Sequence, residues 1–256
     1  MKTGKSYNKI KEMCAEKRFE MAKSKLSNSK GLDVLSNLIQ HIKVNQNTRW
    51  IVYDSSIRNQ IPISYAAHAF NELQRTVLSY EVIRICTFWD RVDLDSFSIP
   101  TIVALADCEK IKELVYESHY NQYIHEPKLP TEVRRNLAKA AGEKGRGYLE
   151  AGIELAKKTS HSRLLKGVQN QRHKLAHLLE KTNRENANAQ KSEAVTIPQY
   201  GDERKLLCKT IETVKKLHLG LNSVGFDWDG CIEINEKNAK ALWQGTRFSI
   251  STRDNS

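Results

Sequence analysis

One heptapeptide, residues 171–177, carries the residue types that metal-free cleavage of a phosphodiester requires. Its sequence, Gln-Arg-His-Lys-Leu-Ala-His, places four residues between Arg172 and His177, and His173 directly follows the arginine. A guanidinium group binds phosphate and stabilises the charge that develops on it, whereas an imidazole accepts or donates a proton near neutral pH. So short a pattern also arises by chance, and its meaning depends on the helix that carries it.

That helix is predicted to begin after Thr159 or Ser160 and to end near Asn183. On a helical wheel, apolar residues occupy one face and a polar stripe occupies the opposite face. The apolar face holds Leu164, Val168, Leu175 and Leu179, and the stripe holds Lys166, Asn170, His173 and His177. Arg172 lies roughly 140° from His177 on this wheel, so a second copy of the helix across a two-fold axis would help to complete a site.

Two other interpretations of these residues stay open. A solvated helix face rich in Lys and His requires no function. Alternatively, His173 and His177 have the one-turn spacing of zinc ligands, although no thiol or carboxylate at ligand spacing stands nearby to complete the set. We therefore expect no metal site and no cofactor.

The elements that position the heptapeptide are predicted to be helical nearly throughout, because apolar residues recur at spacings of three and four. Only 12 glycines and 5 prolines interrupt 256 residues. Asp33 and Ser98 are predicted helix caps, with Pro100 in the first turn after Ser98. The predicted helices cover about 5–26, 33–44, 64–90, 98–123, 131–158 with breaks at Gly142, Gly145 and Gly147, 159–183 and 202–222. Residues 50–53 predict a strand or an extended linker.

The composition indicates a basic protein of the cytoplasm. A net charge of +11 favours a polyanionic partner such as RNA, DNA or an acidic membrane surface. The five cysteines are scattered and odd in number, which indicates reduced thiols rather than a disulfide framework. The first twenty residues lack the apolar core of a signal peptide, and no apolar run has the length of a membrane span. We expect a cytoplasmic protein without a membrane partner.

Two motifs resemble a known group of helical proteins. Arg-His-Lys-Leu-Ala-His at 172–177 is similar to the arginine, polar residue, three others, histidine signature of the HEPN superfamily of prokaryotic defence and toxin systems. Phe-Trp-Asp-Arg at 88–91, followed by Ser-Ile-Pro at 98–100, resembles the abortive-infection AbiU-type branch of HEPN-like proteins. The resemblance spans roughly residues 61–225.

This resemblance implies an all-α, antiparallel helical bundle that forms a homodimer. Residues 61–225 would be the HEPN-like helical domain, residues 1–60 an N-terminal helical extension, and residues 226–256 an irregular C-terminal tail. It also implies a metal-independent endoribonuclease of an abortive-infection or toxin–antitoxin system, with RNA as substrate and an antitoxin or other defence protein as a further partner. The alternative is a non-catalytic module that binds RNA, nucleotide or a partner protein in the same groove.

The implied roles fall on the heptapeptide and its polar stripe. Arg172 would bind the scissile phosphate, His177 would act as general base or acid, and His173 would orient phosphate or share the proton transfer. From the wheel we add three RNA-backbone contacts, predicted at Lys166, Asn170 and Lys174. One HEPN branch regulated by a nucleotidyltransferase antitoxin has a tyrosine two residues after the histidine. Leu179 stands there in this chain, so that form of control is not expected.

Three further features have plainer interpretations. The glycines at 142, 145 and 147 are predicted to separate helices rather than to cradle phosphate, since no strand precedes them and no Gly-Lys-Ser/Thr ending follows. The aspartates at 90, 93 and 95 are predicted to end a helix rather than to bind a cation. A basic patch of Arg134, Arg135, Lys139, Lys144 and Arg146 is as consistent with a solvated face as with an RNA contact.

Overall fold

The computed structural model describes residues 5–127, 130–177, 181–182, 185, 187 and 199–250. These residues form helices without any strand, and the all-α prediction is confirmed. The elements are α1 (Lys5–Glu12), α2 (Ala15–Leu26), α3 (Val34–Thr48), the π-helical turn η1 (Arg49–Tyr53), α4 (Ser55–Arg58), α5 (Tyr65–Thr87), α6 (Ile99–Ala106), α7 (Glu109–Ile124), α8 (Thr131–Ser160), α9 (Arg163–His177), α11 (Asp202–Asn222) and α12 (Trp228–Gly245).

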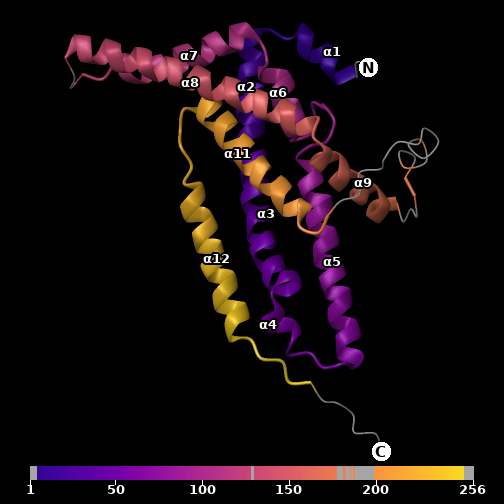
Figure 1. Cartoon of the computed structure of the whole chain (residues 1–256). Helices are drawn as coiled ribbons and strands as arrows, with labels where there is room; N and C mark the ends of the chain where they lie inside the picture. The colour runs from indigo at the N-terminus through magenta and orange to yellow at the C-terminus, as the bar shows by residue number, and fades with distance from the viewer. Residues whose placement is uncertain are drawn as a thin grey trace, which may run out of the picture.

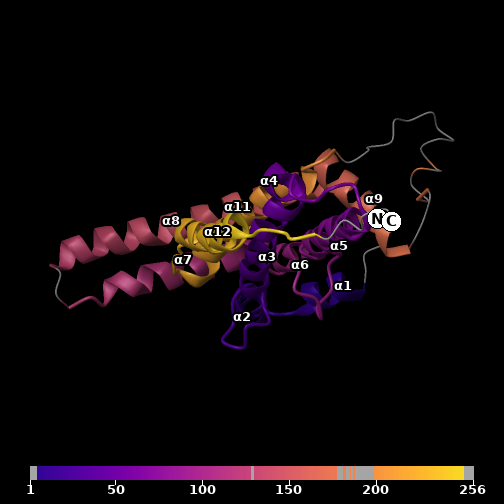
Figure 2. The same ribbon diagram turned by 90° about the horizontal axis from the view of Figure 1, so that it is seen from below.

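The helices form a projecting hairpin and a bundle that meets it. α7 and α8 run antiparallel and extend beyond the rest of the molecule on one side, as both views show (Figures 1 and 2). α3, α5 and α12 lead away from the hairpin in Figure 1, and α9 lies at the end of the molecule opposite the hairpin tip. One main apolar core links helices from α1 to α12. Within the described residues, no helix combines the length and apolar character needed to cross a membrane.

Local start signals of two helices are confirmed. The Asp33 carboxylate accepts a hydrogen bond from the Ser36 backbone N–H at 2.8 Å, as expected for the cap of α3. The Ser98 hydroxyl accepts from the Thr101 N–H at 3.4 Å, with Pro100 in the first turn of α6. These caps depend on neighbouring residues alone, so the sequence suffices to identify them.

The predicted breaks at Gly142, Gly145 and Gly147 are wrong, because α8 is one continuous helix of 30 residues. The first two glycines serve close packing instead. A Cβ atom on Gly142 would lie 2.7 Å from the Tyr116 ring, and one on Gly145 would lie 2.4 Å from the His119 ring. The missing side chains let α7 lie directly against α8, and His119 Nε2 also lies 2.8 Å from the Gly220 carbonyl oxygen of α11.

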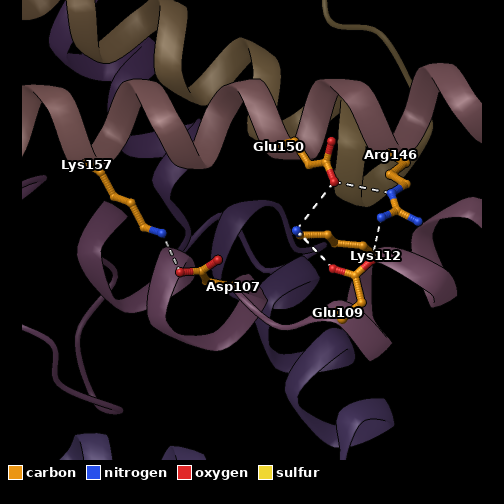
Figure 3. A network of polar contacts seen from close by, with 6 residues as sticks. All are labelled: Asp107, Glu109, Lys112, Arg146, Glu150 and Lys157. Carbon is orange, nitrogen blue, oxygen red and sulfur yellow. Dashed lines mark hydrogen bonds and ion pairs between the residues drawn. The ribbon is translucent and has the colours of Figure 1, made fainter.

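Ion pairs link α8 to α7 and to Asp107, the residue that follows α6 (Figure 3). The Lys112 ammonium lies 3.1 Å from a Glu109 oxygen and 3.4 Å from a Glu150 oxygen. Arg146 pairs with the same two carboxylates, and Lys157 lies 2.6 Å from Asp107. Hydrogen bonding to Lys112 is the main cause that lowers the pKa of Glu109. Part of the predicted basic patch, Arg146, is therefore neutralised within the protein.

Four other boundaries differ from prediction. The helix expected over 5–26 is broken between α1 and α2, and the one expected over 98–123 is broken between α6 and α7. Residues 50–53 belong to the π-helical turn η1 rather than to a strand or an extended linker. Most of the tail predicted to be irregular is α12, whose N-cap Asp227 accepts from the Gly230 N–H at 2.9 Å. α12 packs against α3, a contact between distant segments that local pattern does not reveal.

Candidate functional site

The end of α5 is fixed against α9 through Trp89, which is buried. The indole N–H of Trp89 donates to the Thr210 hydroxyl of α11 at 2.9 Å, and its carbonyl oxygen accepts from the Gln169 amide of α9 at 3.4 Å. The preceding Phe88 carbonyl accepts from the Ile99 N–H at 2.8 Å. The two residues that follow, Asp90 and Arg91, are thereby held beside α9.

Asp90 and Arg172 form an ion pair that joins the two motifs of the sequence. The Arg172 guanidinium donates to an Asp90 carboxylate oxygen, and their side chains are 28% and 40% exposed. Asp90, which we predicted to end a helix, therefore pairs with the candidate phosphate-binding arginine. The pair is partly open to solvent, so an incoming anion can compete with Asp90 for the guanidinium group.

The ion pair lies in an open groove of about 710 Å³. The groove brings together residues from the end of α5, the loop after it, and α9: Trp89, Asp90, Arg91, Asp93, Ser96, Gln169, Arg172, His173, Ala176 and His177. All three predicted catalytic residues, Arg172, His173 and His177, thus face one groove of a single chain. Arg172 and His177 lie roughly 140° apart on the helical wheel, and both nevertheless line this groove.

The far wall of the groove is a loop held in a fixed conformation. The Asp93 N–H donates to the Thr101 hydroxyl at 3.0 Å, and the Asp93 carboxylate accepts from the Asp95 N–H at 3.0 Å. From α2, the Lys25 ammonium donates to the Leu94 and Ser96 carbonyl oxygens at 2.5 and 2.8 Å. Burial lowers the pKa of Lys25, against the opposing charges of the nearby aspartates.

The two imidazoles are neighbours on the exposed surface of α9. The rings of His173 and His177 are stacked, with centroids 6.0 Å apart and planes 16° from parallel. Both residues are exposed, as the predicted stripe required. In the described part of the chain, no third Cys, His or carboxylate joins them in an arrangement suited to a metal ion.

Cys86 of α5, four residues before Asp90, carries a buried thiol near the ion pair. Burial is the largest influence on its pKa and raises it to about 12, with Arg172 acting in the opposite direction. The thiol is therefore protonated at neutral pH and is not a nucleophile.

Asn170 does not lie on the exposed stripe, so this part of the prediction is wrong. The residue is only 4% exposed. Its amide donates to a Glu185 oxygen at 2.9 Å, and its amide oxygen accepts from the Thr182 hydroxyl at 2.6 Å. Lys174 lies 2.7 Å from the same Glu185 carboxylate, which helps to lower the pKa of Glu185 to about 2. Asn170 and Lys174 contact Thr182 and Glu185 rather than lining the groove.

Lys166 is partly exposed and does not line the groove. The helix begins at Arg163, and the Ser162 hydroxyl, rather than Thr159 or Ser160, accepts from the Leu165 N–H at 3.2 Å. The described part of α9 ends at His177, and the positions 178–180 and 183 of the predicted helix lie outside the described residues.

Sequence reasoning missed the contribution of Arg91, Ser96 and Gln169 to the groove. A signal for Arg91 was present, since Asp90 and Arg91 belong to a motif that accompanies the histidine motif. Two motifs far apart in sequence but shared by one family are expected to meet in space. Gln169 lies one turn from His173 on the same helix and gave no signal of its own.

Comparisons with known proteins give one family. The model of the HEPN_AbiU2 family, described as AbiU2, matches residues 32–242. A search of curated proteins gave no significant match, and neither did a search of solved structures. The matched region contains both groove-forming motifs and extends from before α3 almost to the end of α12.

Proposed function

We propose, from the premise that this chain belongs to the AbiU2 family of HEPN proteins, that it is a metal-independent endoribonuclease of a prokaryotic abortive-infection or toxin–antitoxin system. The observation that carries the proposal is the single groove that holds Arg172, His173 and His177. The net charge of +11 supports a polyanionic substrate.

The chemistry needs one proton acceptor, one proton donor and one cation. In the proposed reaction, His177 accepts the proton of a ribose 2′-hydroxyl, whose oxygen attacks the adjacent phosphorus. The bond from phosphorus to the 5′-oxygen breaks, and that oxygen takes a proton from His173 or from His177 after proton exchange. The products are a 2′,3′-cyclic phosphate and a free 5′-hydroxyl. Arg172 stabilises the additional negative charge on the phosphoryl oxygens in the transition state.

Asp90 gives this mechanism a resting state. With the groove empty, the carboxylate occupies the guanidinium group of Arg172. A phosphodiester entering the groove replaces one anion by another, so Arg172 remains paired throughout. The displaced Asp90 carboxylate is 40% exposed and is left to solvent, and its bond to Arg172 keeps the arginine oriented toward the groove before substrate arrives.

We also propose that two protomers pair, so that the active site is completed at a homodimer interface as the family resemblance implies. Each chain carries Arg172, His173 and His177 in its own groove, and pairing would add a second copy of these residues to the same site. Pairing would place two such grooves near each other and shield the reacting phosphate from water. An antitoxin or other defence protein that covers this face would then control access to RNA.

The direct experiment is cleavage of a random-sequence, single-stranded 12-nucleotide RNA in excess chelator. Arg172→Ala and His177→Ala are each expected to lower the rate constant about a hundredfold or more, because each removes a group that acts in the transition state. Lys166→Ala, a charge change on the same helix outside the groove, is the matched control. Cleavage at the wild-type rate by both groove variants would refute the proposal.

Mixing the two inactive variants tests the shared site. If one protomer supplies Arg172 and its partner supplies His177, a mixed dimer has one complete site and activity returns. If each groove works alone, every site in the mixture lacks one residue and activity stays absent. The second result would contradict the composite interface while leaving the ribonuclease proposal intact.

The second candidate function is binding without cleavage in the same groove. The Asp90–Arg172 ion pair favours this candidate, because an arginine that keeps its carboxylate partner can still donate its remaining N–H groups to RNA but neutralises less charge in a transition state. This candidate predicts that the wild-type protein binds the 12-nucleotide RNA without turnover and that Arg172→Ala abolishes the binding.

A further inference from the structure

Arg91 is the one arginine of the groove that has no carboxylate partner among the residues that the structure describes. It lies directly after Asp90, lines the groove with Arg172 and is exposed. No hydrogen bond or ion pair involves its side chain within the described ranges. The two groove arginines therefore differ in state, because Arg172 is paired with Asp90 whereas Arg91 has no ion-pair partner within the described residues.

Asp93, the second carboxylate of the groove, forms no ion pair with Arg91 within the described residues. The Asp93 carboxylate turns to its own loop and accepts from the Asp95 N–H at 3.0 Å. Its charge and that of Asp95 also act on the Lys25 ammonium, which lies behind the loop. Asp90 is paired with Arg172 and the Asp93 carboxylate accepts from its own loop, so within the described residues neither carboxylate holds the Arg91 side chain in an ion pair.

The backbone beneath Arg91 is fixed on both sides. Trp89 is bonded to α9 and α11, and Asp93 is bonded to Thr101 of α6. An arginine side chain on such a base can move while its Cα position stays constant. A flexible cation on a rigid base suits the capture of a phosphate whose exact position varies along an RNA strand.

We infer that Arg91 is the cation that docks RNA in the groove, by binding a phosphate beside the scissile one, and that Arg172 acts on the scissile phosphate only after exchange from Asp90. The inference rests on the proposed function for the identity of the ligand. It assigns the two arginines to separate steps. Arg91 governs ground-state binding, and Arg172 governs the chemical step. The substrate must then carry at least two adjacent phosphodiesters, so an oligoribonucleotide fits and a dinucleoside monophosphate does not fill the site.

The test separates binding from turnover with the same 12-nucleotide RNA. Arg91→Ala is expected to raise KM and the dissociation constant about tenfold while kcat stays unchanged, since one charge-assisted hydrogen-bonding group is lost. The slope of log affinity against log salt should fall by about 0.7, the value for one phosphate contact on a single strand. Arg91→Lys should retain the salt slope. Arg163→Ala, at the exposed start of α9 and outside the groove, is the matched control and should change neither quantity.

The possible results distinguish the docking role of Arg91 from the ribonuclease proposal. An unchanged affinity and salt slope in Arg91→Ala would overturn the inference, as would a fall in kcat without a change in KM. If the wild-type protein binds this RNA through Arg91 but does not cleave it, the docking inference stands and the ribonuclease proposal fails. If Arg91→Ala and Arg163→Ala weaken binding equally, the effect belongs to overall charge, and the inference is wrong.

Discussion

Two helix contacts of this protein use an arginine between helices, and they use it differently. On the hairpin, Arg146 of α8 pairs with two carboxylates, Glu109 and Glu150, above helices that meet at glycine. At the other end of the molecule, Arg172 of α9 pairs with Asp90 alone and faces an open groove. The first contact is closed by further charges and by close packing. The second leaves room for another anion.

The difference shows which arginine is suited to bind a ligand. A guanidinium group with two carboxylates would lose both to gain one phosphate, whereas one with a single partly exposed carboxylate can exchange it. The number of carboxylate partners and the open groove, rather than residue type, therefore separate the ion pairs of the hairpin from the candidate site. We therefore expect the two contacts to respond differently to pH, to a methyl group added at the helix interface and to the loss of one carboxylate.

The largest expected effect is a fall in the free energy of unfolding at acid pH. The helices on the groove side should be the first to lose structure. His41 of α3 is buried against Phe88, and neither ring nitrogen has a partner within the described part of the chain. Burial, with help from Arg84, lowers its pKa from 6.5 to about 4. The unfolded chain therefore binds more protons between those two values. The free energy of unfolding should therefore fall by about 3 kcal/mol as the pH is lowered from 6.5 to about 4.

Buried Glu81 complicates the total profile, because burial raises its pKa to about 7 and its contribution improves as the pH falls from 7. The difference between wild type and His41→Leu isolates the histidine. We expect the variant to lose the acid sensitivity, and His68→Leu, a change at an exposed position of α5, to retain it. Hydrogen exchange at pH 5 should show α5 and α9 losing protection before α8 and α11. Loss in the opposite order would contradict the comparison.

The next effect concerns packing in the hairpin. Gly145→Ala places a methyl group 2.4 Å from the His119 ring, so either the ring or the helix must move. We expect a loss of about 2 kcal/mol in the free energy of unfolding, measured with urea. Gly147→Ala is the matched control, since nothing lies within 4 Å of the added atom, and it should gain up to about 1 kcal/mol from helix propensity. Equal effects of the two changes would show that α7 does not rest on α8 in this way.

The smallest effect compares the loss of one carboxylate from each contact. Asp90→Asn removes the anion that holds Arg172, so in the variant Arg172 adds to the ground-state binding that Arg91 provides, and affinity for the 12-nucleotide RNA should rise about tenfold with little change in stability. Glu109→Gln leaves Arg146 and Lys112 with Glu150, and it should alter neither RNA affinity nor, by more than about 1 kcal/mol, the free energy of unfolding. A fluorescence-anisotropy titration distinguishes the two variants. Weaker binding by Asp90→Asn would mean that the carboxylate orients Arg172 rather than competes for it.

Sequence alone predicted the features that depend on local chemistry. The caps at Asp33 and Ser98, the all-helical class and the start of α11 near Asp202 follow from neighbouring residues and periodicity. The two motifs identified the family and marked both walls of the groove. The histidines were predicted to be exposed, and they are.

The errors arise where a distant segment decides the outcome. Gly142 and Gly145 look like helix breakers until Tyr116 and His119 of α7 are placed against them. Asn170 looks exposed on a wheel, but Thr182 and Glu185 cover it. α12 packs against α3, which is distant in the sequence, so a local pattern does not reveal its position. Arg172 reaches the histidine groove because its long side chain is drawn there by Asp90, an attraction that a wheel of Cα positions does not contain.

The continuity of α8 has a mechanical consequence. Thirty residues at about 1.5 Å each give a rod about 45 Å long. The rod crosses α11 near Leu149 and Gly152, which is closer to its Ser160 end than to its Thr131 end. Only His161 and Ser162 separate it from α9. α8 is thus a lever of unequal arms, with α11 as the fulcrum and the candidate groove beyond the short arm. If α8 tilted about this crossing as a rigid rod, its Thr131 end would move about twice as far as its Ser160 end.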